Sequence, residues 1–128
     1  MKILVVDDDH EMRQLILATL KGAGYQDFEE ASDGVSGLRA LEGVDLVLAD
    51  LHMPGMSGGS LIREIRSNQR TSHLPVIAIT SDSEETTVSR IVREGVEAYL
   101  IKPFDTKMLV EKVNNVRNKL IAQGRLPG

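Results

Sequence analysis

Cysteine and tryptophan are both absent from this 128-residue chain, and only four aromatic residues occur, Tyr25, Phe28, Tyr99 and Phe104. The absence of cysteine excludes disulfide frameworks, thiolate zinc sites and cysteine nucleophiles. Four scattered aromatic side chains are too few for a platform on which the bases of single-stranded nucleic acid stack. Function classes that depend on thiols or on base stacking are therefore excluded.

Positive charge and long apolar runs are also in short supply. The 15 Lys and Arg residues and 19 Asp and Glu residues leave a formal net charge of −4. Such a chain binds polyanions poorly, because neutralising phosphate groups needs a basic surface. Residues 3–6 are too few for the core of a signal peptide, and no run approaches the length of a membrane span. We expect a cytoplasmic protein that binds neither nucleic acid nor membranes directly.

The chain does contain two alternating patterns. Five short apolar stretches predict strands, and most are continuous, which is typical of strands buried on both faces of a parallel sheet. Apolar residues at helical spacing follow each stretch. The predicted strands are residues 2–6, 28–31, 44–49, 76–79 and 98–101. The apolar helix positions are Met12, Leu15, Ile16, Leu20, Val35, Leu38, Leu41, Leu61, Ile62, Ile65, Val88, Ile91, Val92, Leu109, Val113, Val116 and Leu120.

Five strand–helix units predict an α/β fold, a (βα)₅ doubly wound sheet of five parallel strands. Right-handed connections place helices on both faces, which gives three α/β/α layers, and the flavodoxin-like strand order 2-1-3-4-5 is the common one. The length suits one domain, assigned to residues 1–122. Residues 123–128 are expected to be a frayed tail or the stub of a linker. The output would then come from a partner protein or from sequence beyond this chain.

Short signals mark the expected helix ends. Asp9 is expected to cap the helix after the first strand, and Asp105 or Thr106 to cap the last helix. Residues 81–84 have the spacing of a capping box, and Gly95 is expected to stop the helix that begins there.

Polar residues occur at the ends of four predicted strands. Asp7, Asp8 and Asp9 follow the first strand, Asp50 the third, Thr80 the fourth and Lys102 the fifth. Ligands of such sheets bind outside the carboxyl ends of the strands, where parallel strands bring these residues to one edge. We therefore expect the functional site there.

The residue types at this edge indicate a particular chemistry. Carboxylates of Asp7, Asp8 and Asp50 crowded together would repel one another and raise one another's pKa, and a divalent cation would relieve that repulsion. Ligands that are oxygen atoms only favour Mg²⁺. Lys102 can pair with a carboxylate or a phosphate, and Thr80 can donate its hydroxyl to a phosphate oxygen. This set suits phosphoryl transfer onto a carboxylate.

Each of these residues also has an ordinary explanation. An Asp after a strand often caps the next helix, which suits Asp9. Thr80 would ordinarily be a turn residue and Lys102 a surface lysine. Asp7 and Asp8 together fit the capping explanation badly, because one helix needs one cap. The joint occurrence at four strand ends favours the functional interpretation.

With these residues in place, the sequence resembles the receiver domain of two-component response regulators. Four motifs carry the resemblance, in matching order and spacing, over residues 2 to about 121. They are Ile3-Leu4-Val5-Val6-Asp7-Asp8-Asp9, Asp50-Leu51-His52-Met53-Pro54-Gly55-Met56-Ser57-Gly58, Thr80-Ser81 and Lys102-Pro103-Phe104.

The resemblance implies a role for each site residue. Asp50 would accept a phosphoryl group from the phosphohistidine of a sensor histidine kinase or a histidine phosphotransfer protein. Asp7, Asp8, Asp50 and the backbone carbonyl of His52 would bind Mg²⁺. Thr80 and Lys102 would contact the phosphoryl group. The Lys102–Pro103 peptide bond would be cis.

A switch is implied by the same resemblance. Phosphorylation would draw Thr80 inward, and Tyr99 would swing from exposed to buried. The face made by the fourth helix, fifth strand and fifth helix would then change shape and bind an output protein or a C-terminal effector domain. A dimer that forms on phosphorylation is compatible with this mechanism. The ordinary alternative for Tyr99 is a half-buried strand aromatic.

Two further residues are expected to lie beside the path of the water that would hydrolyse the acyl phosphate. His52 is the second residue after Asp50, and Asp82 the second after Thr80. We predict that this pair tunes the lifetime of the acyl phosphate, with a pH dependence near neutrality from the imidazole. The alternative is that His52 is a solvent-facing loop residue.

Three other functions share parts of this pattern. A Mg²⁺-dependent phosphohydrolase of the haloacid dehalogenase type would need a second Asp where His52 stands, and its acceptor on the first strand. A pseudo-receiver that is never phosphorylated would not need the complete site. A flavodoxin-like flavin binder would need a hydroxyl-rich and glycine-rich phosphate loop where three Asp residues stand.

Overall fold

The computed structural model describes residues 1–52, 58–81 and 85–127. It forms one sheet of five parallel strands in the order β2-β1-β3-β4-β5, with a helix after each strand, which confirms the predicted (βα)₅ doubly wound fold. The strands are β1 Lys2–Val6, β2 Asp27–Ala31, β3 Leu46–Asp50, β4 Val76–Thr80 and β5 Ala98–Ile101. The helices are α1 His10–Gly22, α2 Gly34–Arg39, α3 Gly58–Ser67, α4 Glu85–Arg93 and α5 Thr106–Ala122.

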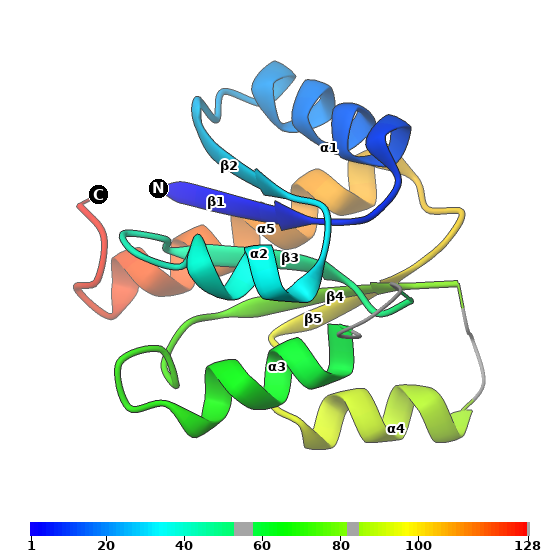
Figure 1. The fold of residues 1–128 in the computed structure, drawn as a ribbon. Helices are drawn as coiled ribbons and strands as arrows, with labels where there is room; N and C mark the ends of the chain where they lie inside the picture. Colours follow the sequence, from blue (N-terminus) through cyan, green and yellow to red (C-terminus); the bar gives the residue numbers. More distant parts are fainter. Residues whose placement is uncertain (53–57, 82–84, 128) are drawn as a thin grey trace.

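The sheet separates two apolar cores. Helices α1 and α5 cover one face, and α2, α3 and α4 cover the other (Figure 1). Successive residues of a strand point to opposite faces. In β1, therefore, Ile3 and Val5 pack toward α1 and α5, and Leu4 and Val6 pack toward α2 and α3. Every residue of β3 and β4 is buried, as expected for central strands of a covered parallel sheet.

Some boundaries and faces differ from the sequence prediction. Strand β3 begins at Leu46, because the N–H of Val44 bonds to the carbonyl oxygen of Leu41 and forms a turn. Leu15 was predicted on the buried face of α1, yet it is 46% exposed and Leu17 is buried instead. Apolar residues on an amphipathic helix fill more than one stripe, and packing against β1 and α5 selects which stripe is covered. The predicted helix positions Val35 and Val92 are likewise exposed.

The predicted caps Asp9 and Asp105 and the stop at Gly95 agree with the structure, whereas α2 ends at Arg39, before the predicted helix position Leu41. The Asp9 carboxylate accepts the N–H groups of Glu11 and Met12, and the Asp105 carboxylate accepts the N–H of Lys107. Gly95 follows α4 with a φ of +84°, a conformation that favours glycine. The predicted capping box at residues 81–84 extends outside the described residues.

The segment after α5 contacts the rest of the domain. The Arg125 Nη2 donates to the carbonyl oxygen of His73 at 3.0 Å, and Leu126 packs against the core between the sheet and α5. No helix within the described ranges is long and apolar enough to span a membrane.

Candidate functional site

The carboxyl end of the sheet brings Asp7, Asp50, Thr80 and Lys102 together. Asp50 and Thr80 are the last residues of β3 and β4, and Asp7 directly follows β1. These three side chains are buried, with 1% of Asp7, 4% of Asp50 and none of Thr80 exposed. Lys102 follows β5, and its Nζ lies 3.2 Å from Asp7 Oδ2 and 3.3 Å from Asp50 Oδ2. One ammonium group therefore bridges two buried carboxylates.

Strand register explains this convergence. Parallel pairing aligns Val6 with Ala49, Asp50 with Ile79, and Thr80 with Ile101, so the four polar residues lie at the ends of neighbouring strands, each step from β3 to β5 being offset by one residue. The Lys102 backbone is held there by its N–H bond to the Thr80 carbonyl oxygen at 2.7 Å. The Lys102–Pro103 peptide bond is cis, as the resemblance implied.

Asp8 completes an acidic cluster. Carboxylate oxygens of Asp7, Asp8 and Asp50 lie within 4.8 Å of one another, with Asp7 and Asp50 buried and Asp8 exposed. Three carboxylates partly neutralised by one lysine leave negative charge for a cation, and oxygen ligands suit Mg²⁺. The donor set therefore fits this ion.

The charge arrangement shifts two pKa values. Burial raises the pKa of the Asp7 carboxyl above its usual 3.8, and the charge of Asp50 adds to the rise, whereas the N–H of Asp9 and the Lys102 ammonium oppose it. Burial alone would lower the pKa of Lys102, but the charges of Asp50 and Asp7 outweigh it and raise the pKa above 10.5. Lys102 is therefore a permanent cation at neutral pH.

His52 lies against both Asp50 and Thr80. Its backbone N–H donates to Asp50 Oδ1 at 3.1 Å, and its Nε2 lies 3.3 Å from Thr80 Oγ1. The residue as a whole is exposed, so its ring contacts the site from the solvent side. Asp82, the predicted second member of this pair, lies outside the described residues.

Arg13 and Glu30, both missed in the sequence analysis, form an ion pair next to the acidic cluster. Arg13 of α1 donates from Nη1 to the backbone carbonyl oxygen of Asp7 at 2.6 Å, and its Nε lies 3.2 Å from Glu30 Oε1. Arg13 stands one helical turn after the cap Asp9, which returns its side chain to the end of β1. This spacing is the only signal that could have drawn attention to it.

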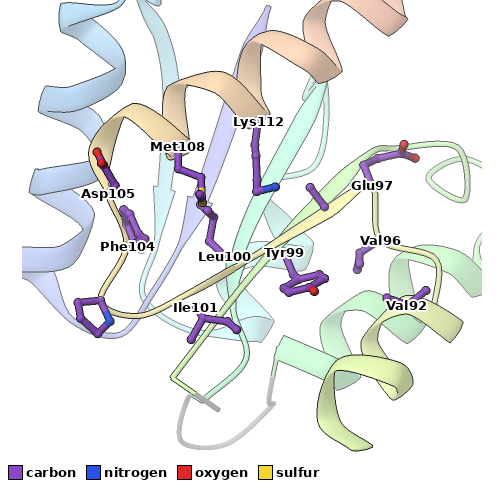
Figure 2. Close-up of a pocket in the computed structure, with 12 residues that line it drawn as sticks. Val92, Val96, Glu97, Tyr99, Leu100, Ile101, Phe104, Asp105, Met108 and Lys112 are labelled. Carbon is purple, nitrogen blue, oxygen red and sulfur yellow. The ribbon is translucent and has the colours of Figure 1, made fainter. Parts of the chain in front are cut away.

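Tyr99 lies in a groove at the edge of the sheet. It is half-buried on β5 in a hollow of about 700 Å³ between α4 and α5. Figure 2 shows Tyr99 on the same side as Val92 and Val96, with Met108 and Lys112 of α5 across β5. Half-burial is what we expected of an ordinary aromatic residue in a strand. The role of Tyr99 as a switch that swings inward on phosphorylation stays a prediction.

Comparison with known proteins bears on this arrangement. The family model for the response regulator receiver domain matches residues 3–114. The chain belongs to the response regulator receiver domain family. As a receiver domain of the CheY type it is a signalling domain, consistent with two-component systems.

Relatives of this receiver domain include chemotaxis proteins. It is 36% identical over 118 residues to the chemotaxis protein CheY of Pseudomonas aeruginosa, covering 91% of this chain and 95% of that protein. It is 37% identical over 119 residues to CheY1 of Helicobacter pylori, covering 91% and 96%.

Solved structures share the fold. A CheY-like receiver domain protein from Methanospirillum hungatei matches with a TM-score of 0.85 and 25% identity over 95% of this chain and 97% of that one. The receiver domain of a histidine kinase from Syntrophus aciditrophicus matches with a TM-score of 0.84 and 27% identity, covering 93% and 91%.

Proposed function

We propose that this receiver domain accepts a phosphoryl group on Asp50 from the phosphohistidine of a sensor histidine kinase or a histidine phosphotransfer protein. The observation that carries the proposal is the bridge of Lys102 between the buried carboxylates of Asp7 and Asp50. A carboxylate oxygen of Asp50 attacks phosphorus, and the bond between phosphorus and the donor imidazole nitrogen breaks. The imidazole keeps the electron pair and takes up a proton.

The remaining site residues prepare Asp50 for this reaction. Lys102 is charged at neutral pH and stabilises negative charge on the transferring group. Thr80 offers its hydroxyl to a phosphoryl oxygen. Asp7, Asp8, Asp50 and the backbone carbonyl of His52 would hold Mg²⁺. When bound, Mg²⁺ supplies positive charge that offsets the repulsion between the carboxylates and the phosphoryl oxygens.

The output of the domain is binding rather than turnover of a substrate. Thr80 leaves His52 to contact the phosphoryl group, and Tyr99 turns inward into the space vacated. The groove of α4, β5 and α5 then changes shape for an output protein, a C-terminal effector domain or a second phosphorylated copy. Catalysis is confined to the domain's own phosphorylation and dephosphorylation.

We assign the receiver to residues 1–122 and place the protein in the cytoplasm.

Intact mass measurement tests the acceptor. After incubation with Mg²⁺ and a small acyl phosphate, the wild type is expected to gain one phosphoryl group that is slowly lost, and Asp50→Asn is expected to gain none. Asp7 also pairs with Lys102, so a phosphoryl group gained by Asp50→Asn would show that Asp50 is not the sole acceptor.

Other results of the same incubation would favour the other functions. Rapid, repeated release of phosphate would favour a phosphohydrolase. A wild type that gains no phosphoryl group, although it binds Mg²⁺, would favour a pseudo-receiver and contradict the proposal.

We also propose that His52 and Asp82 set the lifetime of the acyl phosphate. The His52 backbone N–H donates to Asp50 Oδ1 at 3.1 Å, and the ring reaches Thr80 from the solvent side, so the side chain starts from a position between the acceptor and solvent. His52→Ala is expected to shorten the half-life several-fold because water gains access. Half-lives of purified phosphoprotein measure the effect. His73→Ala, an exposed histidine away from the site, is the control, and equal half-lives for all three proteins would contradict the prediction.

A further inference from the structure

Arg13 contacts the acidic cluster through the Asp7 backbone and contributes no carboxylate to it. Its guanidinium group is held by three residues: the Asp7 carbonyl oxygen at 2.6 Å, Glu30 Oε1 at 3.2 Å and His10 Nδ1 at 3.3 Å. Only 14% of the side chain is exposed. A planar group fixed on three sides has little freedom to rotate, so it holds its partners in one geometry.

Glu30 in turn is fixed from α1. Gln14 Nε2 donates to Glu30 Oε1 at 3.0 Å, the same oxygen that accepts from Arg13 Nε. Strand β2, the start of α1 and the end of β1 are thereby joined in one hydrogen-bonded group. Asp7 is held from β2 as well, because its N–H bonds to the Ala31 carbonyl oxygen at 3.1 Å.

The bond from Arg13 acts on the turn that carries the first two carboxylates. Asp7 and Asp8 lie between the last residue of β1 and the cap of α1, where no strand ladder fixes the carbonyl of Asp7. Asp7 Oδ1 also accepts the N–H of Asp9 at 2.9 Å, so the Asp7 carboxylate is tied to the same turn whose first peptide Arg13 holds, and a movement of that turn would move the carboxylate. Anchoring the carbonyl therefore orients the carboxylate.

We propose that Arg13, oriented by Glu30, is a positioning residue for the metal site formed by Asp7, Asp8 and Asp50. It acts through the Asp7 backbone and touches neither the ion nor the phosphoryl group. The Glu30 carboxylate neutralises the positive charge of Arg13. Arg13 can therefore lie close to the acidic cluster and repel a divalent cation only weakly. The inference rests on the proposed Mg²⁺ site.

Electrostatics and positioning predict opposite signs for the removal of Arg13. Loss of a cation, which also frees the Glu30 carboxylate, would strengthen Mg²⁺ binding if charge alone mattered. Loss of the anchor weakens binding, because groups that orient metal ligands typically contribute about 10–100-fold to metal affinity. The sign of the change therefore separates the two roles.

Calorimetric titration of the full chain with MgCl₂ tests the proposal. We expect the Kd of Arg13→Ala to rise about tenfold. Arg13→Lys keeps a donor for the Asp7 carbonyl and is expected to recover much of the loss. Lys2→Ala removes another cation that pairs with a β2 carboxylate, Glu29 at 3.3 Å, but at the opposite end of β1, and is expected to leave the Kd within about twofold.

Each result has one interpretation. Unchanged or tighter Mg²⁺ binding by Arg13→Ala would overturn the positioning role, as would an equal loss in Arg13→Lys. A thermal unfolding curve for each variant separates unfolding from weaker binding. If Arg13→Ala does not fold, the folded Arg13→Lys variant decides. It keeps the positive charge, so Mg²⁺ binding weaker than that of Lys2→Ala reports changed geometry, and equal binding contradicts the positioning role. A wild type that binds no Mg²⁺ would instead contradict the proposed function.

Discussion

Replacing Lys102 by Met is expected to lower the free energy of unfolding by about 3 kcal/mol at neutral pH without Mg²⁺. Lys102 Nζ pairs with Asp7 at 3.2 Å and with Asp50 at 3.3 Å, and both carboxylates are almost fully buried. Methionine matches the length of the side chain but leaves two neighbouring buried charges without a counter-ion. Removing one partner of a buried ion pair costs far more than the pair itself contributes. Urea unfolding monitored by circular dichroism measures the loss.

Lys119→Met is the matched control for this variant. Lys119 Nζ lies 3.6 Å from Glu97, and its side chain is 65% exposed. An exposed pair of this kind contributes less than about 1 kcal/mol. If Lys102→Met lost no more stability than Lys119→Met, the bridge would not be the counter-ion of the buried carboxylates.

Mg²⁺ and pH provide two further checks on Lys102. Saturating Mg²⁺ is expected to restore part of the lost stability, because the cation replaces the missing positive charge. The pKa of Lys102 is raised in the folded state, so its stabilising effect is complete below pH 10.5 and is lost as the pH rises through the folded-state pKa. The difference between wild type and Lys102→Met should therefore shrink in strong alkali. Phosphorylation of Asp50 is expected to slow in this variant even with Mg²⁺ present.

Asp7→Asn is expected to have two effects of opposite sign. Without Mg²⁺ the variant should be more stable than the wild type at neutral pH, because Asp7 and Asp50 share one lysine and the substitution leaves one carboxylate for one ammonium group. With Mg²⁺ the order should reverse, because the variant loses a metal ligand and at least about tenfold in affinity. Urea unfolding with and without MgCl₂ measures both effects.

The pH dependence of the Asp7 effect has a defined direction. Burial and the charge of Asp50 raise the folded-state pKa of Asp7, so folding disfavours its ionised form. This penalty is present above the folded-state pKa and disappears below 3.8, where the carboxyl is protonated in both states. The advantage of Asp7→Asn should therefore vanish in acid. Retention of the full advantage in acid would show that the charge is not its cause.

The pKa of Asp33 is shifted in the opposite direction to that of Asp7. It caps α2 through the N–H of Ser36 at 2.7 Å, and this bond lowers its pKa. Stability from Asp33 is therefore present above 3.8 and is lost as the pH falls through its folded-state pKa. Asp33→Asn should show no gain in stability at neutral pH, in contrast to Asp7→Asn.

Much of the fold was accessible from local patterns. The strands Leu46–Asp50 and Val76–Thr80 are buried on both faces of the parallel sheet, and all their residues except the last are apolar, which made them recognisable in the sequence. The caps Asp9 and Asp105 are recognisable because capping involves residues two or three positions apart. Leu15 was predicted wrongly, because helical periodicity alone does not say which side of a helix with many apolar residues meets the sheet.

The sequence by itself determined the family, the order of elements and the set of polar residues at the carboxyl ends of the strands. Periodicity and parallel connection place Asp7, Asp8, Asp50, Thr80 and Lys102 at one edge of the sheet, whatever the details of packing. These are properties of neighbouring residues and of the rules by which strands connect.

Only the tertiary structure decided how those residues meet. Burial of Asp7 with exposure of Asp8, and the reach of Lys102 to two carboxylates, depend on side-chain directions set by packing. Arg13 is the clearest case, because its partner Glu30 is 17 residues away and neither belongs to a motif. Contacts between residues far apart in the chain require the assembled sheet, which is why the contacts of Arg13 with Glu30 and with the end of β1 became visible only in the structure.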